Sequence, residues 1–267
     1  MSNIEYMDLK QTAKQAALKA GEELYSRFNK FDRGTVELKS NHEILTQADL
    51  ASEKKILAEI KDNFPDHRIL SEEAGDTEKD SDYLWVVDPL DGTTNFSMHN
   101  PLWSVSIGVF YQEQVVLGVI YAPFLNELYI AETGQGAELY SPADSSEGKK
   151  LQVSSIDQGK VLNAFCHGTE EKDIKRAVEY HKEQKLNDFD CRQLGSAAIE
   201  LAFVAAGRIE SIVIPGAHPW DVAAGVLLVR EAGGKVTDSD GRDWNLESED
   251  MIASNGLVHE QILNTLE

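Results

Sequence analysis

Apolar residues recur at helical spacing in two segments near the start of the chain. In residues 7–28 they form one broad, alanine-rich face. In residues 49–63 a similar face carries Ile56 and Ile60. This spacing is typical of amphipathic helices that pack one face on a core. We therefore predict two long helices, the second beginning near Asp49.

Shorter apolar runs follow, and they indicate strands. Residues 68–70 form one run, which ends at Ser71-Glu72-Glu73, and residues 83–87 form another, which we expect to end at Asp88. From Trp103 onward, short apolar segments alternate with turn residues, a pattern typical of an antiparallel meander. The meander's predicted strands are 105–111, 115–121, 127–131 and 137–140.

Beyond residue 150 the pattern changes to alternating strands and helices, which favours an α/β arrangement. The small, polar and charged segment 141–150 separates the two patterns. We therefore predict an N-terminal α+β half over 1–145 and a C-terminal α/β half over 146–267. The predicted elements of the second half are strands at 161–165 and 209–214 and helices at 171–185, 196–206 and 220–232.

Two carboxylates lie at the end of the buried strand that begins at Tyr83. Asp88 and Asp91 are three residues apart, so both side chains can point at one spot. The residues that follow, Gly92 to Thr94, resemble the first turn of a helix, whose backbone N–H groups suit a phosphate. Hard oxygen ligands beside an anion site predict Mg²⁺-assisted chemistry on a phosphate.

Further acidic residues lie far away in the sequence. Glu72 ends the preceding strand, and Asp221 lies near the start of the helix predicted at 220–232. A pair of metal ions needs a bridging carboxylate, and Asp88 is placed to supply it. The Leu90 carbonyl is expected to be free, because the preceding proline disrupts regular strand pairing.

Each of these features also has a plain structural explanation when it is taken alone. Asp221 could cap a helix, Glu72 could be a solvated strand end, and Gly92 to Thr94 could form an ordinary turn. Taken together they favour a cation site, because two buried carboxylates without a cation are costly. A covalent aspartyl-phosphate at Asp88 stays open. For His218, close to Asp221, we favour a supporting role over direct catalysis.

Composition narrows the class of protein. The chain has 267 residues, 42% of them hydrophobic, and a formal net charge of -21. Such a charge argues against a nucleic-acid scaffold, and it means that an anionic substrate needs local cations. Cys166 and Cys191 are far apart, so neither a zinc site nor a disulfide framework is expected, and a reducing cytoplasm fits. Residues 1–28 lack the basic region and apolar block that are typical of a signal peptide, so none is expected, and no apolar run has the length needed to span a membrane.

These motifs together resemble the inositol monophosphatase family of Mg²⁺-dependent, lithium-sensitive sugar-phosphate phosphatases. Residues 88–96 match its first signature, and residues 220–225, continuing to 231–234, match its second. Glu72 matches the upstream metal-binding glutamate, and residues 195–198 match a substrate-side turn. The resemblance covers nearly the whole chain, in the family's order.

The resemblance implies an α/β (α+β) fold, a five-layered α-β-α-β-α sandwich that is usually a homodimer. It also implies a magnesium centre. By position, Glu72, Asp88 and the Leu90 carbonyl bind the first ion, and Asp88, Asp91 and Asp221 bind the second. The resemblance also implies a third, weaker ion near Glu72.

The resemblance also assigns catalytic and substrate-binding roles. Glu72 and Thr93 activate the attacking water, and the amides of Gly92 and Thr93 bind the phosphate. Lys39 and Asp49 fall near the positions of a mobile-loop lysine and a nearby aspartate in the family. The implied catalytic residues are Glu72, Asp91 and Thr93, and the implied substrate-binding residues are Asp91, Gly92, Thr93, Gly195, Ser196 and Ala197.

One departure from the family concerns substrate choice. Ile214 stands where members that use inositol phosphates carry an acidic residue. An apolar side chain cannot accept hydrogen bonds from ring hydroxyls, and such a site discriminates weakly between hydroxyl patterns. We predict a cytoplasmic Mg²⁺-dependent phosphomonoesterase for inositol 1-phosphate or a related polyol or sugar phosphate, with no nucleic-acid or membrane partner. The alternatives are a relative selective for fructose 1,6-bisphosphate, a nucleotide bisphosphate or NADP, and a non-catalytic metal-binding regulatory dimer.

Overall fold

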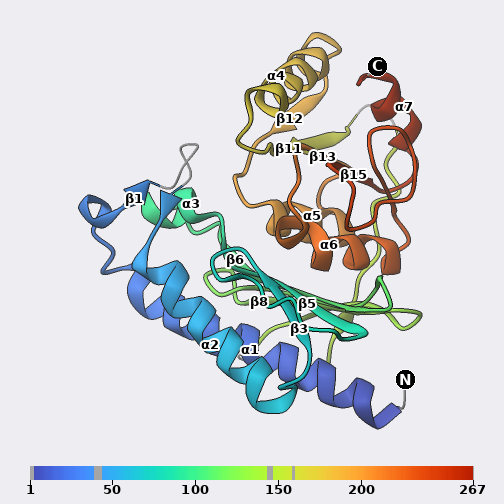
Figure 1. Ribbon diagram of the computed structural model, residues 1–267. Coiled ribbons are helices and arrows are strands. Elements are labelled where there is room, and N and C mark those ends of the chain that lie inside the picture. Colours follow the sequence, from blue (N-terminus) through green and yellow to red (C-terminus); the bar gives the residue numbers. More distant parts are fainter. Residues whose placement is uncertain (1–2, 39–43, 143–146, 158–159, 267) are drawn as a thin grey trace.

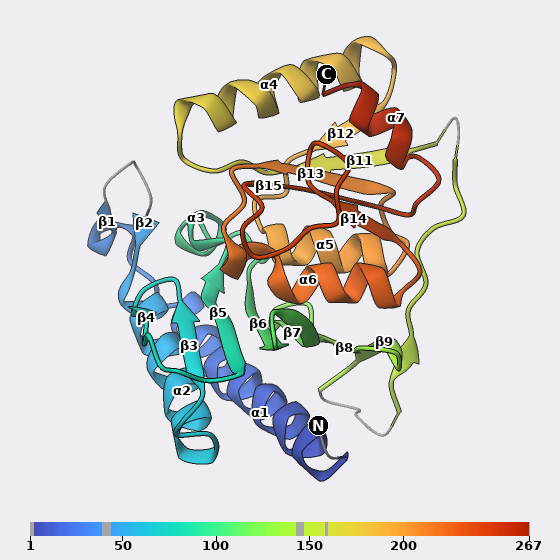
Figure 2. The ribbon, with the colours of Figure 1, turned by 45° about the vertical axis from the view of Figure 1, so that its right-hand side comes forward.

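The protein folds into five alternating layers of helices and sheets (Figure 1). The computed structural model describes residues 3–38, 44–142, 147–157 and 160–266. One helix pair covers the outer face of the first sheet, a second pair lies between the sheets, and two more helices cover the second sheet (Figures 1 and 2). The predicted five-layered α/β sandwich is confirmed.

The first sheet is built mainly from the predicted meander. Its eight strands run in the order β10-β9-β8-β7-β6-β5-β3-β4, and only β3 and β5 pair in parallel. The strand bounds are β3 Arg68–Ser71, β4 Gly75–Asp76, β5 Tyr83–Asp91, β6 Ser104–Tyr111, β7 Gln114–Ala122, β8 Glu127–Glu132, β9 Gly136–Tyr140 and β10 Lys149–Lys150.

The second sheet is mixed, with five strands in the order β12-β11-β13-β15-β14. The pairs of β11 with β12 and with β13 are parallel, and the pairs that include β15 are antiparallel. The bounds are β11 Leu162–Phe165, β12 Asp190–Arg192, β13 Ser211–Pro215, β14 Lys235–Thr237 and β15 Asp250–Ser254. A small separate ribbon pairs β1 Glu37–Leu38 with β2 Ile44–Leu45.

The helices lie close to the predicted ranges. The second begins after Thr46, whose backbone N–H donates to Asp49 at 2.8 Å, so Asp49 helps to cap its start. No helix among the described residues is both long enough and apolar enough to cross a membrane. The bounds are α1 Asn3–Phe28, α2 Gln47–Asn63, α3 Thr93–Ser97, α4 Glu171–Leu186, α5 Ala197–Ala205, α6 Pro219–Glu231 and α7 His259–Asn264, with a 3₁₀ turn at Arg33–Thr35.

The end of β5 differs from the sequence prediction. The strand does not stop at Asp88 but continues to Asp91. Asp88 is opposite Ser106 and Asp91 is opposite Ser104, so three steps along β5 match two steps along β6. That extra residue is a β-bulge. Side chains alternate along a regular strand, and the bulge therefore brings two residues that are three apart onto the same face.

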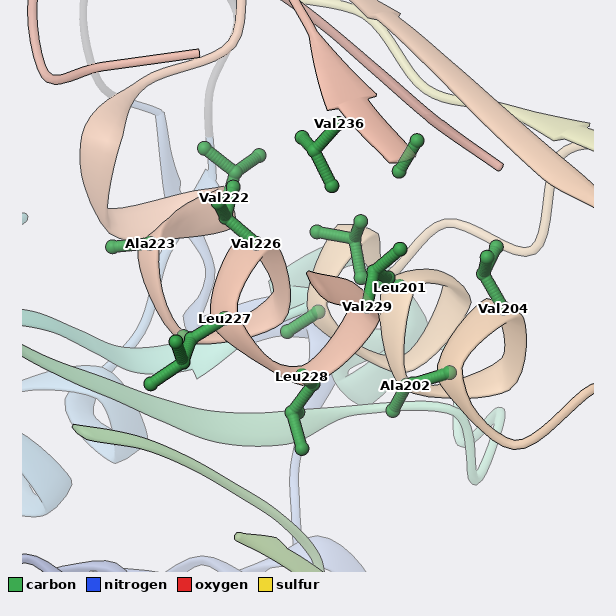
Figure 3. Close-up of a cluster of buried hydrophobic side chains, with 14 of the residues drawn as sticks. Leu201, Ala202, Val204, Val222, Ala223, Val226, Leu227, Leu228, Val229 and Val236 are labelled. Atoms are coloured by element: carbon green, nitrogen blue, oxygen red, sulfur yellow. The ribbon is translucent and has the colours of Figure 1, made fainter. Parts of the chain in front are cut away.

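The middle layer of helices packs tightly against both sheets (Figure 3). An apolar cluster that includes Leu201 on α5 and Val226 on α6 also contains Ile120 from the first sheet and Ala253 from the second. At Gly118, an added Cβ atom would lie 2.5 Å from the carbonyl oxygen of Ala224, so the β7 backbone touches α6. The predicted division of the chain between residues 145 and 146 stays a prediction, and both residues lie outside the described part of the chain.

Candidate active site

The site is centred on Asp88, which is almost completely buried in β5. Burial raises the pKa of its carboxyl well above the usual range, and the negative charges of Glu72, Asp91 and Asp221 raise it further. The backbone N–H of Leu90 donates to Asp88 Oδ1 at 2.9 Å, and this hydrogen bond lowers the pKa of Asp88 in part. The structure therefore brings the acidic residues of three separate sequence segments within electrostatic range of one another.

Asp91 faces the start of α5. The backbone N–H groups of Ala197 and Ala198 donate to its carboxylate, each at 3.1 Å, and the hydroxyl of Ser196 donates as well. Burial raises the pKa of Asp91, while these hydrogen bonds oppose the rise. The predicted turn at 195–197 thus reaches the site, and the Ala197 N–H binds a protein carboxylate there.

Asp221 enters from the second half of the chain. It occupies the third position of α6, and its Oδ2 accepts a hydrogen bond from the backbone N–H of His218 at 3.1 Å. A carboxylate in this first turn is favoured by the helix dipole. The ring of His218 stacks on Trp220 with 4.8 Å between the centroids, which fits the supporting role that we predicted.

Thr93 begins α3 and contacts two predicted site residues. Its Oγ1 lies 3.0 Å from Asp49 Oδ1 and 3.0 Å from the Leu90 carbonyl oxygen. The Leu90 carbonyl was expected to be free and instead lies within hydrogen-bond distance of this hydroxyl, whose single proton it shares with Asp49. At least one lone pair of the carbonyl is left for a cation. Burial raises the pKa of Asp49 to about 6, and its hydrogen bonds with Thr46 and Thr93 limit the rise. Lys39 lies outside the described residues.

The turn before α3 requires glycine. Gly92 has a φ of +89°, and an added Cβ would lie 3.0 Å from the Leu102 carbonyl oxygen and 3.1 Å from that of Gly195. Left-handed backbone and close packing both favour glycine here. The first N–H groups of a helix have no acceptor within the helix, which is the geometry that suits an anion. Phosphate binding at this turn stays a prediction.

A pocket of about 520 Å³ opens beside these acidic residues. Of the predicted site residues, Glu72, Asp91, Gly195, Ala197 and Asp221 line it, and Ile214 does too. Asp88, Leu90, Gly92, Thr93 and Ser196 lie outside the lining. Thr94 of the predicted anion turn and His218 also line the pocket. The lining residues that sequence reasoning did not assign to the site are Asn95, Met98, Asn100, Cys166, His167, Gly168, Thr169, Gln193, Leu194 and Trp220.

The donors at the site suit a hard divalent cation. They are carboxylate oxygens and one carbonyl oxygen, which are the ligands that Mg²⁺ prefers. Among the described residues, no ion pair involves Asp88 or Asp91, so no basic side chain offsets these buried charges. Among the residues that the structure describes, no group of three or more Asp, Glu, His or Cys side chains is arranged so that it could hold a metal ion without some side-chain movement. The chemistry of the donors fits a metal, and the carboxylates of Asp88, Asp91 and Asp221 each accept a hydrogen bond from at least one backbone N–H group.

The decisive observation is a match over almost the entire sequence. The sequence profile of the inositol monophosphatase family matches residues 5–267. The chain belongs to the inositol monophosphatase family. It is therefore a phosphatase, a phosphoric monoester hydrolase, as predicted.

Individual relatives agree with this assignment. An inositol-1-monophosphatase from Mesorhizobium japonicum is 39% identical, with 94% of this chain and 93% of the relative covered. A fructose-1,6-bisphosphatase/inositol-1-monophosphatase from Thermotoga maritima is 37% identical, with 84% and 82% covered. The crystal structure of extragenic suppressor protein suhB from Bartonella henselae superposes with a TM-score of 0.88 at 32% identity, with 97% and 98% covered.

Proposed function

We propose that this inositol monophosphatase family member is a Mg²⁺-dependent phosphomonoesterase for inositol 1-phosphate or a related polyol or sugar phosphate. The observation that carries the proposal is the position of Asp88, buried among Glu72, Asp91 and Asp221 beside the turn that begins α3. Buried like charges of this kind are costly unless a cation joins them or a carboxyl group is protonated, and a bound cation would satisfy all of these carboxylates at once. We assign two ions, and a third, weaker ion near Glu72.

The residues present would divide the work as follows. Glu72, Asp88, Asp91, Asp221 and the Leu90 carbonyl would hold the metal, which when bound neutralises the phosphate and acidifies water. Thr93, whose hydroxyl is oriented by Asp49 at 3.0 Å, would hold the attacking water.

Proton transfer and phosphate binding would fall to neighbouring groups. Glu72, on the pocket wall, would receive the proton of the attacking water. As the bond between phosphorus and the alcohol oxygen breaks, the leaving oxygen would take a proton from a second water in the pocket. The amides of Gly92 and Thr93 would hold the phosphate oxygens at the start of α3. The reaction then depends mainly on positioning and on charge neutralisation.

The alcohol part of the substrate would occupy the pocket beside Ile214. This side chain is 2% exposed and lines the pocket, so no carboxylate there can select a particular set of ring hydroxyls. Weak selection favours more than one substrate. Fructose 1,6-bisphosphate is the second candidate, because the Thermotoga maritima relative carries both activities in its name.

Phosphate release from a panel of esters tests the proposal. With Mg²⁺ present, we expect inositol 1-phosphate and fructose 1,6-bisphosphate to be hydrolysed with kcat/KM values within about tenfold of each other. A nucleotide 3′,5′-bisphosphate and NADP should be much slower. Release from none of the four would refute the proposal and favour the non-catalytic regulatory alternative.

Ile214→Glu is expected to shift the preference toward inositol 1-phosphate. A carboxylate at this position can accept hydrogen bonds from ring hydroxyls, and one such bond is worth about 1–2 kcal/mol. The kcat/KM ratio of inositol 1-phosphate over fructose 1,6-bisphosphate should rise about tenfold. Ile214→Leu is the matched control, and it should preserve the ratio. An equal ratio in both variants would place residue 214 outside the alcohol site.

We also propose a homodimer that works in a reducing cytoplasm. Both cysteines, Cys166 and Cys191, are free and buried, which suits such a compartment. One chain has a mass of 29.6 kDa, and light scattering should give twice this value. A mass of one chain at micromolar concentration would contradict the dimer.

A further inference from the structure

Glu200 is a buried carboxyl group that the proposed chemistry does not use. It lies in the first turns of α5, in the apolar layer between the sheets, and it has no exposed surface. A buried carboxyl without hydrogen bonds would be strongly destabilising. Glu200 therefore needs partners, and both of its oxygens have them.

The partners of Glu200 are parts of the pocket wall. Its Oε1 accepts a hydrogen bond from the backbone N–H of Leu194 at 2.5 Å, and the Gly195 N–H binds the carboxyl too. Its Oε2 accepts a hydrogen bond from the Cys166 thiol at 2.7 Å. Leu194, Gly195 and Cys166 all line the pocket, whereas Glu200 lies behind them.

The same turn is fixed from its other side. The side-chain amide of Asn95 donates to the Leu194 carbonyl at 2.7 Å and to the Leu102 carbonyl at 2.7 Å. Asn95 belongs to α3, which begins at the phosphate turn. Leu194 is thus hydrogen-bonded through its carbonyl to the phosphate side of the site and through its N–H to Glu200.

Cys166 connects this arrangement to the alcohol side of the pocket. Its backbone N–H donates to the Val213 carbonyl at 3.1 Å, and the next residue of β13 is Ile214. β11 and β13 pair in parallel with Phe165 opposite Val213, so Cys166 follows at the level of Ile214. Through its two oxygens, Glu200 therefore joins the turn at 194–195 to the wall that contains Ile214.

We propose that Glu200 is a positioning residue, which holds the turn at 194–195 and Cys166 together as the wall that receives the alcohol part of the substrate. This inference rests on the proposed function for the identity of the substrate. Glu200 does not itself line the pocket, so we assign its effect on the pocket wall to these hydrogen bonds.

The test compares Glu200→Ala with Glu200→Gln. The alanine variant loses every hydrogen bond, and small misplacements of binding groups have large kinetic effects. Its KM for inositol 1-phosphate should rise about tenfold, with kcat within about threefold. The inhibition constant of inorganic phosphate should stay unchanged, because phosphate binds on the α3 side. The glutamine variant keeps an acceptor for the Leu194 N–H, and its KM should therefore be close to that of the unaltered protein.

Glu210→Ala is the matched control. Glu210 is also a buried acid, its Oε2 accepts a hydrogen bond from the Leu162 N–H at 2.6 Å, and it does not line the pocket. The Glu210→Ala variant should have a KM within about twofold of that of the unaltered protein. Equal KM increases in the Glu200 and Glu210 alanine variants, or an unchanged KM in Glu200→Ala, would overturn the proposal.

Hydrogen exchange gives a readout that does not depend on activity. The amides of Leu194 and Gly195 should exchange at least tenfold faster in Glu200→Ala than in the unaltered protein, and Glu200→Gln should retain protection. If the protein hydrolyses no ester, the proposed function fails. Hydrogen exchange then tests by itself whether Glu200 holds the turn at 194–195. Unchanged protection at both amides would overturn the positioning role. If Glu200→Ala does not fold, Cys166→Ala must still raise KM, and an unchanged KM in that variant would count against the proposal.

Discussion

Asp221→Asn is expected to lower kcat/KM at least a hundredfold while the fold stays intact. Asp221 is the acidic group that α6 brings to Asp88, and its negative charge contributes to the raised pKa of that residue. Asparagine has the same shape, and its side-chain oxygen can still accept the hydrogen bond of the His218 N–H. The change therefore removes the charge that would hold a cation and leaves the helix start in place. Mg²⁺ titration of phosphate release measures the loss.

Asp173→Asn provides a control for this experiment. Asp173 is a buried acid at the third position of α4, the same helix position that Asp221 has in α6. It does not line the pocket, and its variant should keep activity within about threefold. Thermal unfolding of both variants checks the fold. Near-normal turnover of a folded Asp221→Asn protein would refute the role of Asp221 as a metal ligand.

Chelation is expected to reduce phosphate release below about 1% of its starting rate, and excess Mg²⁺ should restore it. The reason is the charge of the site, where Asp88 and Asp91 are buried close to other acids and form no ion pair with any described residue. Only a bound cation lets a phosphate approach such a site. Rates before EDTA, in EDTA and after addition of Mg²⁺ measure the effect.

Metal binding should also stabilise the fold. At a Mg²⁺ concentration about 100 times the dissociation constant, the free energy of unfolding should rise by about 2.7 kcal/mol. Sodium chloride at matched ionic strength is the control, because it screens charge without occupying the site. Full activity in EDTA, or equal stabilisation by the two salts, would contradict a metal centre at Asp88.

Local patterns predicted the elements and the acidic residues of the site because both depend on short segments. Periodicity located α1, α2 and the meander, and the motif around Asp88 located the metal ligands proposed here. The predicted end of β5 was wrong because the strand continues through a β-bulge, and a bulge depends on the partner strand. The residues 88–91 alone give no sign that Asp91 pairs opposite Ser104.

The pocket wall could not be predicted because it depends on tertiary contacts. Cys166 lies 34 residues before Glu200 in the chain, and the tertiary fold brings the two within hydrogen-bond distance. Asn95 and Leu194 are 99 residues apart, yet their hydrogen bond helps to fix the pocket. Asp49 was matched only by its approximate place in the family, and the structure locates it beside Thr93.

The tight middle layer limits how this enzyme can move. α5 and α6 share one apolar cluster with both sheets, so swinging one sheet away from the other would expose that cluster to water. Exposure costs about 25 cal/mol for each Å² of apolar surface, which makes a wide clam-shell motion very rare. Substrate entry and product exit must then rely on small rearrangements of surface loops, and turnover should be insensitive to solvent viscosity wherever those rearrangements are faster than the chemistry.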